Sequence, residues 1–293
     1  MEERLVYIDG EFYPKSQAKV SVFDHGYLYG DGIFEGIRAY NGRIFRCKEH
    51  IDRLYMSAKA IAMEIPLTKQ QMIEALKETC RRNNINNGYI RLVVSRGEGS
   101  LAISPVGCIK PCVVIIADAV RLYPQEMYET GLKVITASTR RNYAAVVDPQ
   151  VKSLNYLNNV LAQIEANRAG VPEAIMLDMQ GNVCECTADN IFIVGRGEVI
   201  TPPAYVGALN GITKQVVIEI CTKLGYKVSE KEFTLYSLYN ADECFLTGTA
   251  AEVIAVTEAD GRVIGTGSAG PITMRILQEF WQVTKEGGEN IYS

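Results

Sequence analysis

The feature that most restricts the fold is a run of apolar residues from Cys112 to Ala119, interrupted only by Asp118. The run has the length of a β-strand, and a strand that does not alternate between apolar and polar residues is typically buried on both faces. The segment 89–97 instead alternates apolar and polar residues, which is also typical of a strand. We therefore expect two strands here, of which residues 112–119 are buried on both faces.

Periodic patterns elsewhere predict both helices and strands. Helices are expected at residues 48–63, 69–83, 156–168 and 213–224 and from Pro271, where Ile276, Leu277 and Trp281 should be buried. Strands are expected at residues 5–8, 11–13, 43–46, 132–138, 173–178, 242–246, 252–257 and 262–265 and at the end of the glycine-bearing stretch 23–40, and Glu185 has neighbours typical of an apolar strand. The length of 293 residues suits one large or two medium domains, and residues 120–131 have the composition of a linker between two halves.

Composition and charge favour a small-molecule partner. The net charge of -4 and pI near 5.5 leave no basic surplus for nucleic acid or an anionic membrane. The N-terminus lacks the apolar core of a signal peptide, and no apolar run approaches the ~20 residues that cross a bilayer, so we expect a cytoplasmic protein. The eight cysteines are scattered, and no zinc-site spacing repeats; we expect reduced thiols and no metal site.

Lys152 stands in a short polar interval between the turn Asp148-Pro149 and the helix expected from Tyr156. A lysine at such a place either faces solvent as an ammonium group or is drawn inward. Burial would lower its pKa and make the neutral amine a nucleophile. The local sequence leaves both possibilities open.

Two further charged residues stand at unusual positions. Arg53 lies at the edge of the apolar stripe of its helix, where it could reach inward or form an i, i+4 ion pair with Glu49. Glu185 lies within an apolar strand, where a lone carboxylate is costly unless it meets a cation. We therefore expect a positively charged partner for Glu185.

Two turns could bind an anion. Leu209-Asn210-Gly211-Ile212-Thr213 leads into a helix, so its amides could bind an anion, or Asn210 could simply cap the helix. Thr247-Gly248-Thr249-Ala250 follows a strand and offers amides and hydroxyls. The glycine-rich stretch 23–36 is not followed by an expected helix, so it is a weak nucleotide signal. The loop 98–111 is long enough to be functional.

These groups complement one another chemically. An arginine, helix N-terminal amides and threonine hydroxyls suit a phosphomonoester, a buried glutamate suits a pyridinium nitrogen, and a lysine amine suits an aldehyde. Pyridoxal 5′-phosphate carries all three groups on one ring.

Motifs along nearly the whole chain resemble the class IV (fold-type IV) pyridoxal-phosphate aminotransferases, and most closely the branched-chain amino-acid aminotransferases. They are Phe23-Asp24-His25-Gly26, Phe34-Glu35-Gly36-Ile37-Arg38, Glu49-His50-Ile51-Asp52-Arg53-Leu54, Tyr89-Ile90-Arg91, Lys152-Ser153-Leu154-Asn155-Tyr156, Glu185 with Asn190-Ile191-Phe192, Gly211-Ile212-Thr213 and Thr247-Gly248-Thr249-Ala250-Ala251-Glu252. The resemblance implies a two-domain α/β (α+β) fold, with a small N-terminal domain of residues 1–119, a linker of residues 120–131 and a large pseudo-barrel of residues 132–293 that binds the cofactor, the site lying at their junction.

The resemblance also implies roles for the cofactor-binding residues. Lys152 would carry the cofactor covalently and then move the proton at the substrate Cα. Tyr156 would hydrogen-bond the phenolic oxygen of the cofactor, and Glu185 would keep its ring nitrogen protonated. The phosphate would be gripped by Arg53, Ile212, Thr213 and Thr249, and Leu209 would press on the ring face.

By the same resemblance the substrates are leucine, isoleucine or valine and, as amino acceptor, 2-oxoglutarate. The substrate pocket would be formed by Tyr29, Phe34, Gly36, Arg38, Tyr89, Arg91, Ile103, Tyr156, Thr249 and Ala250. Tyr29 and the loop with Ile103 would reach the neighbouring subunit's site, which implies a homodimer or a hexamer built as a trimer of dimers.

Other functions stay open at this point. Lys-Ser-Leu-Asn also occurs in D-amino-acid aminotransferases, which makes these the first alternative, with 4-amino-4-deoxychorismate lyase and R-selective amine transaminase behind. In the D-enzymes an arginine and a histidine on the strand after the position of residue 89 bind the carboxylate. This pair is absent here, because the two histidines of the chain are His25 and His50. A non-catalytic cofactor-binding protein would have no need of Lys152, Glu185 and Arg53 together.

Overall fold

The structure, a computed structural model, describes residues 3–119 and 123–293. It contains two compact units. The first comprises Met1–Val120, Val151–Asn155 and Thr284–Ser293, and the second comprises Arg121–Gln150 and Tyr156–Val283. The five residues around Lys152 therefore belong to the first unit, although the second unit flanks them on both sides in the sequence.

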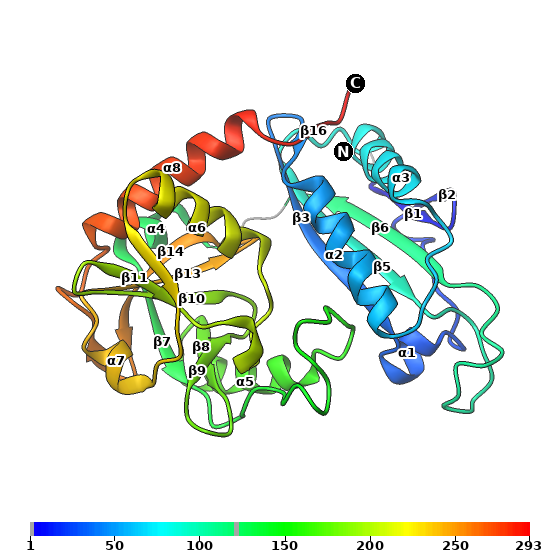
Figure 1. The fold of residues 1–293 in the computed structure, drawn as a ribbon. Helices are drawn as coiled ribbons and strands as arrows, with labels where there is room; N and C mark the ends of the chain where they lie inside the picture. Colours follow the sequence, from blue (N-terminus) through cyan, green and yellow to red (C-terminus); the bar gives the residue numbers. More distant parts are fainter. Residues whose placement is uncertain (1–2, 120–122) are drawn as a thin grey trace. The chain divides into compact units, whose positions relative to one another are not determined.

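The first unit is built on a seven-stranded sheet with the order β16-β4-β3-β5-β6-β1-β2, in which paired strands run antiparallel. The strands are β1 (Leu5–Ile8), β2 (Glu11–Pro14), β3 (Gly32–Tyr40), β4 (Arg43–Ile44), β5 (Gly88–Ser95), β6 (Cys112–Asp118) and β16 (Glu289–Asn290). Helix α1 (His25–Tyr29) precedes β3, while α2 (Cys47–Ala60) packs along β3 and α3 (Lys69–Arg82) packs on β1 and β6 (Figure 1). The apolar side chains between α2, α3 and the sheet form the core of this unit.

Strand β6 differs from the expectation of burial on both faces. Val113, Ile115 and Ala117 are at most 1% exposed, whereas Ile116 is 42% exposed. An apolar run does not reveal that helices α2 and α3 both pack on the face with the core residues. The expectation of burial on both faces was therefore wrong.

The segment with Lys152 lies along the edge of this sheet. The amide of Phe34 donates to the carbonyl oxygen of Lys152 at 2.9 Å, and the amide of Leu154 donates to Gly32 at 2.9 Å. Strand β4 is only two residues long and pairs with Ala39 and Tyr40. The first half of β3 therefore has an edge that β4 does not cover, and the Lys152 segment occupies it.

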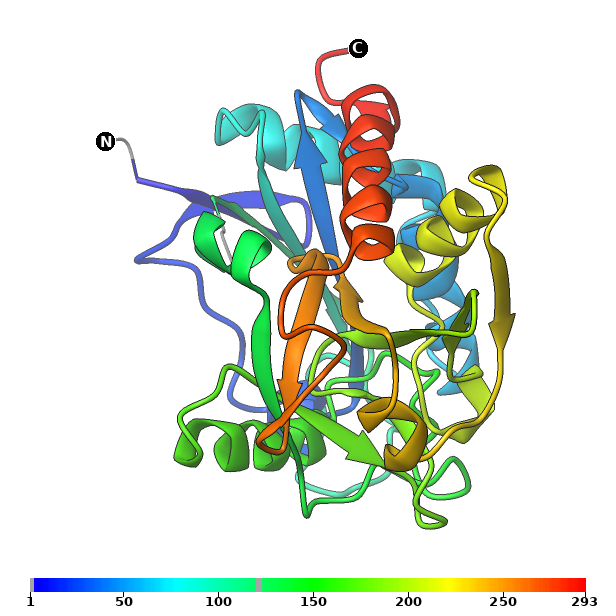
Figure 2. The ribbon, with the colours of Figure 1, turned by 90° about the vertical axis from the view of Figure 1, so that its left-hand side faces the viewer.

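The second unit is built on a nine-stranded sheet with the path β12-β11-β10-β13-β14-β7-β8-β9, and β15 pairs with β14. The strands are β7 (Leu132–Thr136), β8 (Glu173–Leu177), β9 (Val183–Cys186), β10 (Asn190–Gly195), β11 (Glu198–Thr201), β12 (Lys227–Glu230), β13 (Glu243–Gly248), β14 (Glu252–Ala259) and β15 (Arg262–Val263). Strands β7 and β14 run side by side and parallel (Figure 2). Residues 187–189 alone join β9, at the end of the path, to β10 near its start, so the sheet must curl back on itself.

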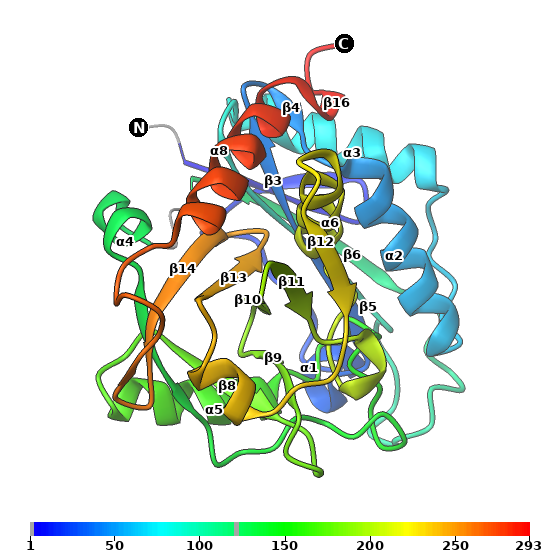
Figure 3. The same cartoon turned by 60° about the vertical axis from the view of Figure 1, so that its left-hand side comes forward.

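Helices surround this curled sheet. They are α4 (Gln125–Thr130), α5 (Leu157–Arg168), the 3₁₀ turn η1 (Ala204–Val206), α6 (Ile212–Lys223), α7 (Leu235–Tyr239) and α8 (Pro271–Glu286). Helix α5 packs on β8, α4 on β14, and α6 on β13 and on β12, the strand that follows it (Figure 3). Their positions mostly match the expected helices within a few residues, but the short helices α4 and α7 and strands β11 and β12 were not expected.

The linker region and helix α8 differ in part from what the sequence predicts. Of the expected linker 120–131, residues 120–122 lie outside the described residues, and Gln125–Thr130 form α4. In α8, Ile276 and Leu277 are buried as expected, but Trp281 is only partly buried and donates its indole N–H to Glu252 at 2.8 Å. Phe280, 2% exposed, is the buried aromatic residue instead.

Candidate active site

Lys152 starts from a rigid backbone in the first unit. Its amide donates to the Ser57 hydroxyl of α2 at 3.3 Å, and its carbonyl accepts from Phe34 of β3. The Nζ atom lies 4.5 Å from the centroid of the Phe34 ring. Contacts with both a helix and a strand fix the origin of this side chain, as a nucleophile requires.

Strands β3 and β5 bring five predicted substrate residues onto one sheet. Gly36 pairs with Arg91 and Arg38 pairs with Tyr89, and Phe34 stands two residues before Gly36 on the same face. The Arg91 guanidinium lies 4.6 Å from the centroid of the Phe34 ring and 5.5 Å from that of the Tyr89 ring. These contacts place cationic and aromatic groups together, as binding of a carboxylate beside an apolar chain requires.

Gly36 makes room for the Tyr89 side chain. A Cβ atom at position 36 would lie 1.9 Å from the Tyr89 hydroxyl oxygen. Because this is far inside contact distance, any residue other than glycine would force the Tyr89 side chain to move.

The Arg53 side chain binds Glu35 and not Glu49. Its Nε and Nη2 atoms donate to the two carboxylate oxygens of Glu35, each at 2.7 Å. Glu49 pairs with Arg46 at 2.9 Å. The ion pair of Arg53 with Glu49, which the sequence left open, is therefore not formed.

The loop 98–111 is tied to α1. His25 donates its Nε2 hydrogen to the carbonyl of Ser100 at 2.8 Å, and the Tyr29 hydroxyl donates to the carbonyl of Leu101. Ile103, near the middle of the loop, is 82% exposed. Tyr29 and Ile103 are thus linked through the loop backbone.

In the second unit Glu185 has the positively charged partner that its burial demands. Its carboxylate lies 2.6 Å from Arg141 and accepts from the Leu209 amide at 2.9 Å. The Asn190 amide group donates to Glu185 at 3.2 Å and to the Leu209 carbonyl at 2.9 Å. Glu185 and the turn ahead of α6 are therefore parts of one hydrogen-bonded network.

Sequence reasoning missed Arg141 as that partner. Its Nε donates to the Gly207 carbonyl at 2.9 Å and its Nη1 to Asn159 at 2.8 Å, so its position is fixed from three sides. Arg141 stands in a stretch without helical or strand periodicity. The only signal for it was the need of Glu185 for a cation.

The turn ahead of α6 is shaped as an anion site. Gly211 is the N-cap residue of α6 and has no side chain that could cap the helix, and the Asn210 side chain accepts a hydrogen bond from Gln215 at 2.6 Å. A Cβ atom on Gly211 would lie 2.0 Å from Asn190 Oδ1. Because the N-cap residue is Gly211 and not Asn210, the amides of the first turn, with Ile212 and Thr213, are suited to an anion.

The turn after β13 is equally tight. Thr247 is 1% exposed, and its hydroxyl has no hydrogen-bond partner among the residues that the structure describes. It pairs across the ladder with Asn190, which holds Glu185. A Cβ atom on Gly248 would lie 1.8 Å from Asp189 Oδ1, so any other residue at this position would push the Asp189 carboxylate aside.

Each unit by itself contains groups that suit one part of pyridoxal 5′-phosphate. The second unit offers the start of α6, the buried Thr247 hydroxyl and a fixed carboxylate, and the first unit offers an arginine and a lysine. Tyr156, the N-cap residue of α5, follows the Lys152 segment directly.

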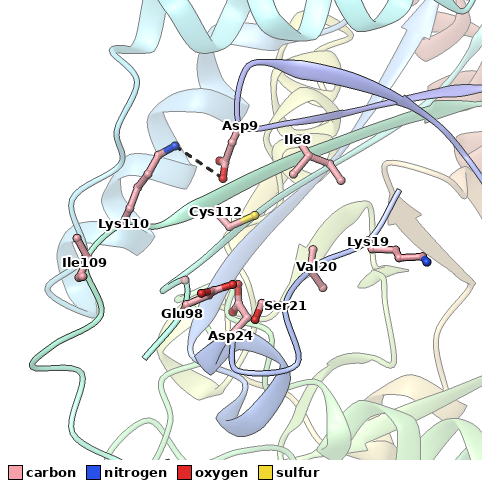
Figure 4. Close-up of a pocket in the computed structure, with 11 residues that line it drawn as sticks. Ile8, Asp9, Lys19, Val20, Ser21, Asp24, Glu98, Ile109, Lys110 and Cys112 are labelled. Atoms are coloured by element: carbon pink, nitrogen blue, oxygen red, sulfur yellow. Dashed lines mark ion pairs between the residues drawn. The ribbon is translucent and has the colours of Figure 1, made fainter. Parts of the chain in front are cut away.

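A pocket of about 380 Å³ in the first unit contains none of these residues (Figure 4). It is lined by Ile8, Asp9, Lys19, Val20, Ser21, Asp24, Gly97, Glu98, Ile109, Lys110 and Cys112. Lys110 and Asp9 form a loose ion pair at 3.9 Å on its wall.

Three further sequence expectations can be compared with the structure. All eight cysteines are free thiols, as expected. Within residues 3–119 and 123–293, no group of three or more metal-ligating side chains is found. Over the same part of the chain, no helix combines the length and apolarity needed to span a bilayer.

Comparisons with known proteins agree with this chemistry. The family model described as Amino-transferase class IV matches residues 32–259, so the chain belongs to the class IV aminotransferases and is a transaminase. The curated protein named "Putative branched-chain-amino-acid aminotransferase" of Methanocaldococcus jannaschii is 52% identical over 98% of this chain and 99% of its own length. The D-alanine aminotransferase of Listeria monocytogenes is 36% identical over 98% of this chain and 99% of its own.

Solved structures show the same fold. The T.th. branched-chain amino acid aminotransferase with pyridoxamine 5′-phosphate superposes with a TM-score of 0.93 at 39% identity, covering 97% of this chain and 95% of the other. The same enzyme complexed with N-(5′-phosphopyridoxyl)-L-glutamate gives a TM-score of 0.92 at 39% identity with the same coverage. The predicted fold class and family are therefore confirmed.

Proposed function

We propose that the chain transfers the amino group of branched-chain L-amino acids (leucine, isoleucine and valine) to 2-oxoglutarate, with pyridoxal 5′-phosphate as cofactor, giving branched-chain 2-oxo acids and L-glutamate. The anchoring of Lys152 on β3 carries this proposal, because β3 and β5 also bear the aromatic and arginine side chains expected around the substrate. The branched-chain relatives support the donor class, and the phosphopyridoxyl-L-glutamate complex of the T.th. enzyme supports glutamate as one partner of the exchange.

When bound, pyridoxal 5′-phosphate supplies an aldehyde and a ring that stabilises negative charge at the substrate Cα. Lys152 Nζ would hold the cofactor at its aldehyde carbon, and its amine would then move the proton from that Cα to the C4′ carbon of the cofactor. Glu185, fixed by Arg141, would accept a hydrogen bond from the ring nitrogen. Tyr156 would hydrogen-bond the phenolic oxygen, and Leu209 would pack on the ring face.

The phosphate would be bound by Arg53, by the amides of Ile212 and Thr213, and by Thr249. The start of α6, whose N-cap residue Gly211 has no side chain, supports this assignment, because the amide end of a helix carries a partial positive charge.

The substrate would be bound mainly by the face of β3 and β5. Tyr29, Phe34, Ile103 and Tyr156 would form apolar walls, and Tyr89 with the Thr249 and Ala250 amides would bind the α-carboxylate. Arg38 and Arg91 would bind the second carboxylate of glutamate or hold Tyr89, and the stacking of Arg91 on Tyr89 supports the latter. The same groups must serve both substrates, because the nitrogen stays on the enzyme between the two half-reactions.

The chain would assemble as a homodimer, or as a hexamer of three dimers. One face of α5 supports this, since Leu157, Val160, Leu161 and Ile164 stand at helical spacing and are 69%, 49%, 46% and 39% exposed. Sedimentation equilibrium tests the prediction, and a monomer with full activity would contradict it. The domain boundaries at residues 119 and 132 and a cytoplasmic location also remain predictions.

The function is tested by incubating the protein with pyridoxal 5′-phosphate, L-leucine and 2-oxoglutarate and measuring L-glutamate. We expect turnover with each branched-chain L-donor, and little with L-lysine as an unrelated donor. Absence of glutamate with all three branched-chain donors would contradict the proposal.

A D-amino-acid aminotransferase is the alternative that the Listeria relative and the Lys-Ser-Leu-Asn segment favour. In the structure the two histidines are engaged elsewhere, His25 with Ser100 and His50 with Glu35. Comparing D-alanine with L-leucine under the same conditions decides between the two, and faster turnover of D-alanine would reverse our assignment.

A further inference from the structure

The buried carboxylate of Glu35 holds Arg53 by two hydrogen bonds. Glu35 lies on β3 with a side chain that is 0% exposed, and Arg53 lies on α2 with a side chain that is 11% exposed. Arg53 donates from Nε to Oε1 and from Nη2 to Oε2, both at 2.7 Å. Such a two-point contact fixes the plane of the guanidinium group, which one bond alone would leave free to rotate.

The geometry of this contact leaves Arg53 with a defined orientation. Nε and Nη2 lie along one edge of the planar group, and Glu35 occupies that edge. The hydrogens of the opposite edge, which includes Nη1, point away from Glu35. An oxyanion bound by Arg53 would therefore meet that opposite edge.

His50 provides a third donor to Glu35. His50 is 2% exposed, and its Nδ1 lies 2.7 Å from Glu35 Oε2. Burial by itself raises the pKa of Glu35, but the charges and hydrogen bonds of Arg53 and His50 outweigh it and hold the pKa at about 2. Burial lowers the pKa of His50, so the ring is neutral near pH 7 and its Nδ1 carries the hydrogen that Glu35 accepts.

We propose that Glu35, seated by His50, is a positioning residue that orients Arg53 toward the phosphate group of the cofactor. This inference rests on the proposed function, in which Arg53 binds that phosphate. Glu35 itself touches Arg53 and His50 and would not touch the cofactor.

Charge and orientation predict opposite effects of removing Glu35. As a negative charge beside Arg53, Glu35 weakens the attraction of Arg53 for an anion, so its neutralisation alone would tighten phosphate binding. If orientation dominates, neutralisation weakens phosphate binding. The carboxylate of Glu35 accepts hydrogen bonds from Arg53 and His50, whereas a glutamine would turn an N–H group toward one of these donors and lose that bond. The sign of the effect therefore decides the proposal.

The experiment measures equilibrium binding of pyridoxal 5′-phosphate and of pyridoxal to the apoenzyme by absorbance titration. The two ligands share the ring and the aldehyde and differ in the phosphate. For Glu35→Gln we expect the Kd of pyridoxal 5′-phosphate to rise about tenfold while that of pyridoxal is unchanged. An unchanged or tighter Kd for pyridoxal 5′-phosphate would overturn the proposal.

Asp31→Asn is the matched control. Asp31 accepts from Arg96 Nε at 2.8 Å and from Nη2 at 2.9 Å, which is the same two-point contact in the same unit. We expect this variant to lower the Tm without changing the ratio of the two Kd values. A change in that ratio equal to that of Glu35→Gln would show that general loosening, and not orientation of Arg53, is the cause.

Arg53→Lys separates the inference from the proposed function. If Arg53→Lys leaves the ratio unchanged, Arg53 does not bind the phosphate and the proposed role of Arg53 fails. If Arg53→Lys raises the ratio of the Kd for pyridoxal 5′-phosphate to the Kd for pyridoxal and Glu35→Gln does not, only the role of Glu35 fails. In the double variant we expect no loss beyond that of Arg53→Lys.

His50→Gln keeps the proposal testable if Glu35→Gln does not fold. It leaves Glu35 and Arg53 in place and removes the ring that seats Glu35. We expect a smaller rise in the Kd of pyridoxal 5′-phosphate, about threefold, with pyridoxal unaffected. If the ratio of the two Kd values is unchanged in a folded His50→Gln protein, His50 does not hold Glu35 in position, and that part of the proposal is wrong.

Discussion

The guanidinium group of Arg141 lies 2.6 Å from the carboxylate of Glu185 in the second unit. Both side chains are almost inaccessible, with 4% and 7% of their surface exposed. The pair gives the buried glutamate a fixed orientation before any ligand arrives, since Arg141 is itself held by Gly207 and Asn159.

Replacing Arg141 should therefore be costly. In Arg141→Met the carboxylate of Glu185 stays buried without its cation, and breaking such a pair from one side costs about 3–5 kcal/mol. We expect a large fall in the unfolding free energy of the apoenzyme, measured by urea denaturation. Arg140→Met, at an exposed neighbouring position, is the control and should stay close to wild type. A stable Arg141→Met protein would show that Glu185 can leave its buried place.

Lys152→Ala should abolish transamination while the protein remains folded. The backbone of Lys152 is held by Phe34 and Ser57, and these bonds do not depend on its side chain. We expect a loss of at least about 10³-fold in L-glutamate formation and no yellow absorbance band with pyridoxal 5′-phosphate. Lys48→Ala, whose side chain is 72% exposed, should behave as wild type. Wild-type turnover by Lys152→Ala would remove the basis of the proposed mechanism.

Gly36→Ala should displace Tyr89. The added methyl group would lie 1.9 Å from the Tyr89 hydroxyl oxygen, and overpacking of this kind costs about 1–3 kcal/mol. We expect a lower unfolding free energy and a higher KM for the amino donor. Tyr89→Ala removes the clash, so Gly36→Ala should cost much less stability in a Tyr89→Ala background. Equal costs in the two backgrounds would mean that the methyl group meets something else.

The buried cluster of Glu35 and His50 should make the protein less stable in acid. Burial lowers the folded-state pKa of His50 below its ordinary 6.5, so the unfolded chain binds more protons and stability falls as the pH drops below about 6.5. Glu35 has its pKa lowered from 4.5 to about 2, so its contribution, on the order of 3 kcal/mol, is complete above pH 4.5 and is lost between pH 4.5 and 2.

Urea denaturation at a series of pH values measures this dependence. His50→Gln should flatten the curve just below pH 6.5 and leave a loss between pH 4.5 and 2. If the slope just below pH 6.5 is the same in His50→Gln and wild type, other groups cause it.

Local signals in the sequence identified most elements and the candidate groups. Thr68 forms a capping box with Gln71 at the start of α3, and Gly211 stands where α6 begins. Helical spacing located α2, α3, α5, α6 and α8 within a few residues. These features depend on interactions over a few residues, so the order of residue types is sufficient to reveal them.

Only the tertiary structure decided which partners the buried charges have. Arg53 pairs with Glu35 on a strand and not with Glu49 on its own helix, and Glu185 pairs with Arg141 from a stretch without periodicity. Likewise, β6 is covered on one face because α2 and α3 pack on the same side. The sequence by itself determined that a buried carboxylate needs a cation, because desolvation is a property of the residue; it did not determine which cation, because that follows from how distant segments pack.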